Sequence, residues 1–92
     1  MIGVTEQAKA ELKEILVSNV DDPRACLRIK YDDNGQLGVA IDIERPEDQT
    51  VEYQGSIILV AEQELADGLS HVELDVEDTE QGRELIIVEK ST

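Results

Sequence analysis

The side chains in this sequence best suited to nucleophilic chemistry or metal ligation are one cysteine and one histidine, Cys26 and His71. Arg28 follows Cys26 by two residues, so in a strand both side chains would lie on the same face. A neighbouring cation lowers the pKa of a thiol and makes its thiolate reactive. No second cysteine and no Cys–His–Asp arrangement accompanies Cys26, and we therefore favour a small apolar side chain packed against a sheet.

His71 follows Ser70 at the start of a predicted strand, without a second histidine or a neighbouring cysteine. A lone imidazole is a weak candidate for a metal ligand or a general base, so we expect an exposed surface histidine. Paired carboxylates need a pocket for acid–base work, and the sequence defines none. We therefore expect the chain not to be an enzyme. An enzyme would require carboxylates of shifted pKa in a pocket around His71 or Cys26.

Two acidic clusters could attract a hard cation, the Asp32–Asp33 pair and the run from Asp75 to Glu80. Neither has the spacing of a calcium-binding EF-hand loop. A loop starting at Asp32 has Leu37 where glycine is required, and one starting at Asp75 has a glutamate there. Solvated acidic turns are the favoured interpretation. The metal-ligand set is left undetermined, with Cys26, Asp32 and Asp33 as weak candidates.

Composition excludes several classes of partner. The chain has 92 residues, enough for one domain over residues 1–92, with 22 acidic and 8 basic residues and a net charge of −14. That charge repels nucleic-acid phosphates and anionic lipids, and two tyrosines offer little aromatic surface for stacking bases. No glycine-rich phosphate loop is present, so no cofactor is expected. The longest apolar run, 57–61, is too short to span a membrane. This short run and the single, unpaired cysteine favour a cytoplasmic location.

The hydrophobic pattern predicts the order α, β, β, β, β, α, β, β, an α+β domain with mainly antiparallel pairing. Thr5 is a plausible N-cap for an amphipathic helix over Glu6–Val17, and a second, short helix is expected over Ala61–Leu69. The predicted strands are Leu27–Tyr31, Leu37–Ile43, Val51–Tyr53, Ser56–Val60, Val72–Val76 and Leu85–Val88.

Three of the predicted strands carry more specific information. The run Ile57–Val60 is apolar on both faces, which is typical of a central strand covered on both sides. Leu27–Tyr31 alternates apolar and basic residues and predicts a half-buried strand. Gly38 and Ala40, on the second face of Leu37–Ile43, suggest that another segment packs closely there.

The order and spacing of several short motifs resemble the HesB/IscA-like family of A-type iron–sulfur carriers. The matching segments cover about residues 3 to 88 and are Val4–Leu16, Leu27–Ile29, Leu37–Ile43, Val51–Val60 and Leu65–Asp75. The resemblance implies a HesB-like fold, in which mixed, mainly antiparallel sheets form a pseudo-barrel with an N-terminal helix and a short second helix. It also implies that a homodimer is a possible assembly.

The family's cluster ligands have no counterpart in this sequence. Family carriers hold a cluster or iron through one cysteine in a Gly-Cys-Ser-Gly-type loop and two in a C-terminal Cys-Gly-Cys. The corresponding loop here is Asp32–Gln36, which is shorter and lacks cysteine, and no Cys-Gly-Cys follows Val88. Cys26 immediately precedes the first matched strand and aligns with no family ligand. No ligand residue can therefore be transferred from the family.

These observations lead to one main hypothesis and one alternative. The main hypothesis is a non-catalytic HesB/IscA-like domain, an accessory or binding protein related to iron–sulfur cluster biogenesis without its own conventional cluster site. Its acidity suits a protein partner with a basic surface. The alternative is a metal-binding carrier that uses carboxylates, or Cys26 across a dimer.

Overall fold

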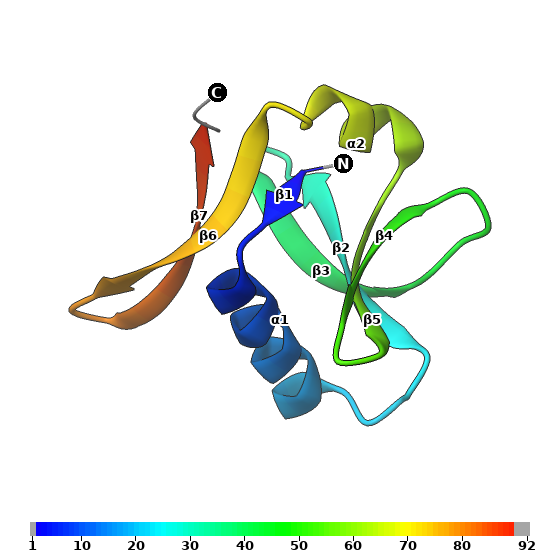
Figure 1. The fold of residues 1–92 in the computed structure, drawn as a ribbon, viewed down its shortest axis with the longest axis horizontal. Helices are drawn as coiled ribbons and strands as arrows, with labels where there is room; N and C mark the ends of the chain where they lie inside the picture. The colour runs from blue at the N-terminus through cyan, green and yellow to red at the C-terminus, as the bar shows by residue number, and fades with distance from the viewer. Residues whose placement is uncertain (1, 90–92) are drawn as a thin grey trace.

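The computed structural model describes residues 2–89 and confirms the α+β fold (Figure 1). The elements are β1 (Gly3–Val4), α1 (Glu6–Asn19), β2 (Ala25–Tyr31), β3 (Leu37–Ile43), β4 (Gln49–Tyr53), β5 (Ser56–Ala61), α2 (Gln63–Gly68), β6 (Val72–Thr79) and β7 (Gly82–Glu89). They form a three-stranded sheet in the order β1-β6-β7 and a four-stranded sheet in the order β3-β2-β5-β4. Residues 90–92, in the tail after Val88 where the sequence was searched for a Cys-Gly-Cys, lie outside the described residues.

The N-terminal helix begins where the sequence predicts and joins the two sheets. The Thr5 hydroxyl oxygen accepts a hydrogen bond from the Ala8 N–H at 3.1 Å and donates one to Asp75 Oδ1 at 2.9 Å. The helix continues to Asn19, whose side chain donates to the Ile15 carbonyl at 2.7 Å and closes the last turn. Its buried face packs against β2, β4, β5 and β6, so α1 lies between the sheets and completes the core.

The doubly apolar segment is the central strand that its sequence predicts. β5 lies between β2, with which it pairs in parallel, and β4, with which it pairs antiparallel. Its residues Ile58–Ala61 are all buried, on both faces of the sheet. The remaining core residues come from both sheets and both helices: Ile2, Ala8, Leu12, Leu16, Ala25, Leu27, Ile29, Ala66, Leu69, Val72 and Leu74.

Strand β2 is more deeply buried than the alternating pattern predicts. All five residues from Ala25 to Ile29 are buried, so both faces are covered there, whereas Lys30 and Tyr31 are exposed. The half-buried prediction is therefore wrong at Arg28, which is buried, and at Tyr31, which is exposed. The second face is covered because Asp48, in the β3–β4 connection, folds over Arg28. Arginine can be buried in this way when its hydrogen-bond donors are matched by carboxylates.

The close packing predicted around Gly38 is absent from the described part of the chain. A Cβ atom placed on Gly38 meets no heavy atom within 4 Å, and β3 is an edge strand of its sheet. Gly38 therefore does not mark a closely packed neighbouring segment. The second helix is also shorter than predicted, because Ala61 ends β5 and does not start α2. Within residues 2–89, no helix is both long enough and apolar enough to cross a lipid bilayer.

Candidate functional site

Cys26 lies near the start of β2 and is buried, with only 1% of its surface exposed. Its thiol donates a weak hydrogen bond to the Asp42 carbonyl oxygen, at an Sγ–O distance of 3.6 Å. Burial raises the pKa of the Cys26 thiol, and the lowering by Arg28 is smaller. The prediction of a small side chain packed against the sheet is confirmed, and the thiol is held in its protonated, weakly nucleophilic form.

Arg28 is the centre of a buried ion-pair cluster on the same face of β2. Its Nη1 and Nη2 donate to the two carboxylate oxygens of Asp48 at 3.0 and 2.6 Å, which is a bidentate pair. Its Nε donates to Asp42 Oδ2 at 2.6 Å, and Nη2 also donates to the Ile43 carbonyl at 3.3 Å. The side chains of Arg28 and Asp48 are 7% and 4% exposed. These hydrogen bonds hold the β3–β4 loop, through Asp48, against β2 in the interior of the sheet.

The charges in this cluster fix its protonation states. The hydrogen bonds from Arg28 lower the pKa of Asp48, and those from the Ile43 N–H and Arg28 lower the pKa of Asp42. The two carboxylates in turn raise the pKa of Arg28. Both carboxylates are therefore ionised at neutral pH, and neither is poised to exchange a proton. This arrangement stabilises the fold and supplies no acid–base chemistry.

The first acidic cluster forms the tight turn between β2 and β3. Asp32 Oδ1 accepts hydrogen bonds from the backbone N–H groups of Asn34 and Gln36 at 2.8 and 3.0 Å. Gly35 has a φ of +78°, in the left-handed region that glycine adopts readily. Asp33 is exposed. The Asp32 carboxylate thus holds the turn, as a side chain does in an Asx-type turn.

The second acidic cluster is spread along the β6–β7 hairpin. Asp75 accepts a hydrogen bond from the Thr5 hydroxyl, and Asp78 forms an ion pair with Arg83 at 3.4 Å. Glu77 lies opposite Glu84 on β7. Strand alternation places Asp75 and Glu77 on one face of the hairpin and Asp78 on the other, so the three carboxylates do not share a face. Nowhere in residues 2–89 are three histidine, cysteine, aspartate or glutamate side chains grouped in a way that could hold a metal ion.

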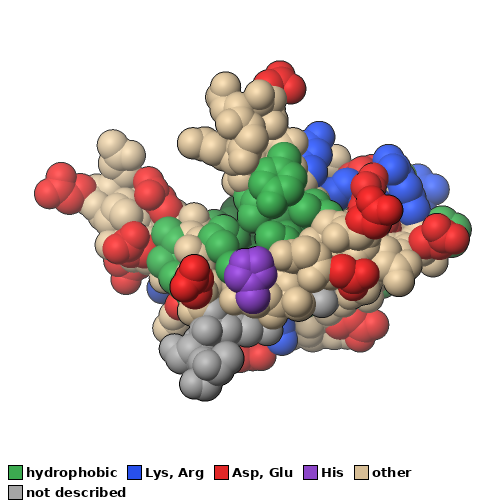
Figure 2. Space-filling model, turned by 90° about the horizontal axis from the view of Figure 1, so that it is seen from above, with side chains coloured by type: hydrophobic (Ala, Val, Ile, Leu, Met, Phe, Trp, Pro, Cys, Tyr) green, Lys and Arg blue, Asp and Glu red, His purple; other side chains and the backbone are tan. Residues whose placement is uncertain are grey.

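The three weak metal-ligand candidates do not come together within one chain. Cys26 is at the start of β2, whereas Asp32 and Asp33 follow its end. At the rise of an extended strand, Cys26 and Asp32 are about 20 Å apart. His71 is far from both in sequence, is exposed just before β6, and is visible on the molecular surface in Figure 2. The prediction of an exposed histidine is confirmed.

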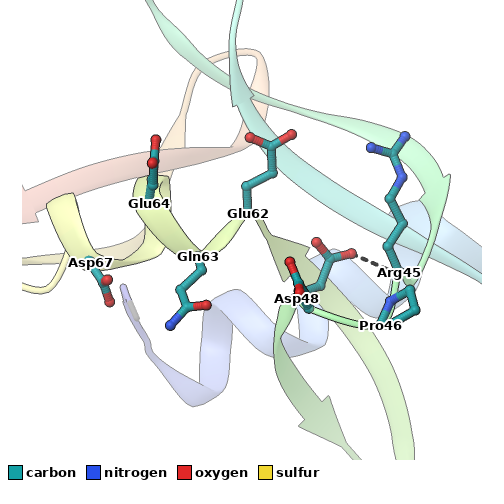
Figure 3. A pocket seen from close by; sticks show the side chains of 8 residues that line it. Arg45, Pro46, Asp48, Glu62, Gln63, Glu64 and Asp67 are labelled. Carbon is teal, nitrogen blue, oxygen red and sulfur yellow. Dashed lines mark hydrogen bonds between the residues drawn. The ribbon is translucent and has the colours of Figure 1, made fainter.

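An open depression of about 710 Å³ lies between the β3–β4 loop and the start of α2 (Figure 3). Its lining residues are Arg45, Pro46, Glu47, Asp48, Glu62, Gln63, Glu64 and Asp67. Asp48 is already paired with Arg28 and also accepts the Arg45 backbone N–H at 2.8 Å. Cys26 and His71 are not among the lining residues, so the depression brings no nucleophile to its carboxylates.

The buried Arg28–Asp48 pair was missed in the sequence. The alternation of Arg28 with apolar neighbours predicts a solvent-facing arginine, and Asp48 belongs to a loop that is polar throughout. The available signal for a buried arginine was the position of Arg28 in a strand, on the same face as a cysteine predicted to be buried. Its partner, Asp48, is 20 residues away in the sequence. Only the folding of the β3–β4 loop over the sheet brings the two together.

Comparison with known proteins identifies the fold. No protein-family profile matches the chain, and no curated protein matches it in sequence. Among solved structures, the chain is similar to the crystal structure of IscA with the [2Fe-2S] cluster, with a TM-score of 0.64 and 17% sequence identity. The match covers 97% of this chain and 85% of that one. The chain therefore has an IscA-like fold, as the resemblance in its sequence implied.

Proposed function

We propose that this domain is a non-catalytic accessory protein related to iron–sulfur cluster biogenesis, which binds a protein partner and holds no conventional cluster of its own. The IscA-like fold supports the connection with iron–sulfur chemistry. The buried state of Cys26 carries the second half of the proposal. Iron–sulfur clusters are usually held by four ligands, most often thiolates. This sequence offers one thiol, and it is buried, protonated and hydrogen-bonded to a backbone carbonyl.

The charge of the chain supports a protein partner of opposite sign. A net charge of −14 accelerates association with a basic surface and discourages binding to nucleic acids and anionic membranes. The proposal assumes a reducing cytoplasm, in which a lone thiol stays unoxidised. Association with the partner should weaken as salt is added, because salt screens these charges.

The experiment for this proposal mixes the domain with a cysteine-bearing IscA-type carrier that holds a [2Fe-2S] cluster. Association is measured by calorimetry, and transfer of the cluster to an apo-ferredoxin is followed by visible absorbance. We expect a salt-sensitive complex and a changed transfer rate. An unrelated acidic domain of equal net charge is the control. No complex and an unchanged rate would remove the link to cluster biogenesis.

The alternative function is a metal carrier that uses carboxylates or Cys26. Because Cys26 and Asp32 lie at opposite ends of β2, a site using both would have to combine two chains. Calorimetry with manganese and ferrous ions would separate the two functions. Stoichiometric binding that resists salt, and is lost in Asp32→Asn with Asp33→Asn or in Cys26→Ser, would favour the carrier. Weak binding that disappears with salt would exclude it.

A further inference from the structure

The edge strand β3 carries an apolar face that the rest of the described chain does not cover. Register with β2 places Ile41 opposite Leu27 and Ile43 opposite Ala25, so these side chains share the face of the sheet that forms the core. Leu27 and Ala25 are buried, yet Ile41 and Ile43 are each 49% exposed. The apolar surface of the sheet therefore continues past the region that α1 and the second sheet cover.

This apolar face continues into a groove at the other end of β3. The groove has a volume of about 190 Å³ and is lined by Ile29, Leu37, Gly38, Val39, Leu74, Leu85 and Ile87. It separates β3 from β7, which are edge strands of the two sheets. Figure 2 shows apolar side chains gathered near the middle of one face of the molecule, with acidic side chains around them. Leu37 and Val39 in the groove, with Ile41 and Ile43 beyond it, are alternate residues of β3, so four apolar side chains lie on one face of the strand.

The free edge of β3 also lacks the features that prevent strand addition. Proteins commonly protect an exposed edge strand with proline, lysine or a bulge. Leu37–Ile43 contains no proline and no lysine, and it pairs with β2 in unbroken register. Its one charged residue, Asp42, is engaged with Arg28. The Ile43 N–H already donates to Asp42 Oδ1 and the Ile43 carbonyl already accepts from Arg28. The outward backbone N–H and C=O groups earlier in β3 can pair with an added strand.

Charge decides what kind of strand this edge can receive. A second copy of the chain would bring another net charge of −14, and the two copies would repel each other. Acidic residues lie at both ends of β3, Asp32 and Asp33 before it and Glu44 after it. We propose that the edge of β3 receives an extended segment of a partner protein, with alternating apolar side chains in its middle and lysine or arginine at both ends. This strand addition deepens the proposed function. It rests on the proposal that the domain binds a protein partner, and it does not depend on the proposed link to iron–sulfur chemistry.

A synthetic peptide, Lys-Lys-Val-Thr-Val-Thr-Val-Thr-Val-Lys-Lys, tests the surface. Binding is measured by calorimetry and mapped by amide NMR shifts and hydrogen exchange. We expect shifts centred on Leu37–Ile43 and slower exchange of the outward amides of β3. A peptide of identical composition with its valines clustered is the control for charge alone, and it should bind about tenfold more weakly.

Two protein variants with the same change of charge locate the site. Ile41→Lys places a lysine on the apolar face of β3. Val17→Lys is the matched control, because Val17 is 58% exposed and lies on α1 and not on β3. We expect about tenfold weaker peptide binding for Ile41→Lys and a change within about twofold for Val17→Lys. Ile43→Lys provides a second edge variant, and urea unfolding confirms that each variant is folded.

The inference would be overturned by no binding, by equal binding of both peptides, or by equal weakening by the two lysine substitutions. Sedimentation showing a dimer that Ile41→Lys dissociates would also overturn it, because a second copy would then occupy the edge. Iron and sulfide retention is a separate measurement. A chain that holds a cluster yet binds the peptide at β3 would refute the proposed function and leave this inference standing.

Discussion

The clearest energetic prediction concerns the buried pair between Arg28 and Asp48. Replacing Asp48 with asparagine removes one negative charge while keeping nearly the same shape. Both side chains are almost fully buried, and two hydrogen bonds of 3.0 and 2.6 Å join them. The substitution would leave the Arg28 guanidinium with Asp42, a more exposed carboxylate, as its only anionic partner among the described ion pairs.

The size of the effect follows from this geometry. Removing one partner of a buried ion pair costs about 3–5 kcal/mol, because an unpaired charge stays in the interior. Asp42 still contacts Arg28, so we expect a smaller loss for Asp48→Asn, about 2–3 kcal/mol. For a domain of this size, that loss lowers the melting temperature by about 10–20 °C. Urea unfolding monitored by circular dichroism measures this loss of stability: the urea concentration at the midpoint falls, while the dependence of the unfolding free energy on urea stays the same.

The same pair predicts how stability depends on pH. Hydrogen bonds from Arg28 lower the pKa of Asp48 below that of an aspartate in the unfolded chain, about 3.9. A lowered pKa stabilises the fold at pH values above the unfolded pKa, and this contribution is lost as pH falls through the folded pKa. The difference between wild type and Asp48→Asn should therefore be constant near neutral pH and shrink below about pH 4.

The matched control is Asp33→Asn, which removes the same charge from an exposed turn position. Exposed substitutions of this kind stay within about 0.5 kcal/mol. If Asp48→Asn unfolds within that margin of wild type, or if its deficit persists unchanged in acid, the account of a buried, structurally required ion pair is wrong.

Two further predictions concern the thiol and the helix start. Cys26 should react with Ellman's reagent about a hundredfold more slowly in the native chain at pH 8 than in urea, since burial restricts access and raises its pKa. Equal rates would contradict a buried thiol. Thr5→Ala should lower the free energy of unfolding by about 1–2 kcal/mol, because it removes the N-cap and the bond to Asp75. Thr5→Ser keeps both bonds and should unfold near the wild-type urea midpoint.

Local chemistry made part of the fold predictable from the sequence. The N-cap at Thr5 and the apolar periodicity after it located α1, although its end lies two residues beyond the prediction because Asn19 closes a further turn. The doubly apolar run Ile57–Val60 identified the central strand, since only a strand covered on both faces excludes polar residues from both. These features depend on residues close together in the sequence.

Features that depend on distant residues escaped prediction. Strand β1 has two residues and shows no periodicity, so only its parallel pairing with β6 defines it. The burial of Arg28 depends on Asp48 in a distant loop, and burial of the second face of β2 also decides the state of Cys26. The small residues of β3 suggested a packed neighbour, whereas the structure shows open space beside Gly38.

The most direct test of the proposed function is anaerobic reconstitution with ferrous iron and sulfide, followed by desalting and measurement of iron and acid-labile sulfide per chain. A Cys26→Ser variant is treated in parallel. The buried, protonated state of Cys26 predicts that wild type retains neither iron nor sulfide and matches the variant. Stoichiometric iron and sulfide in wild type, lost in Cys26→Ser, would show that Cys26 ligates a cluster and would contradict the proposal.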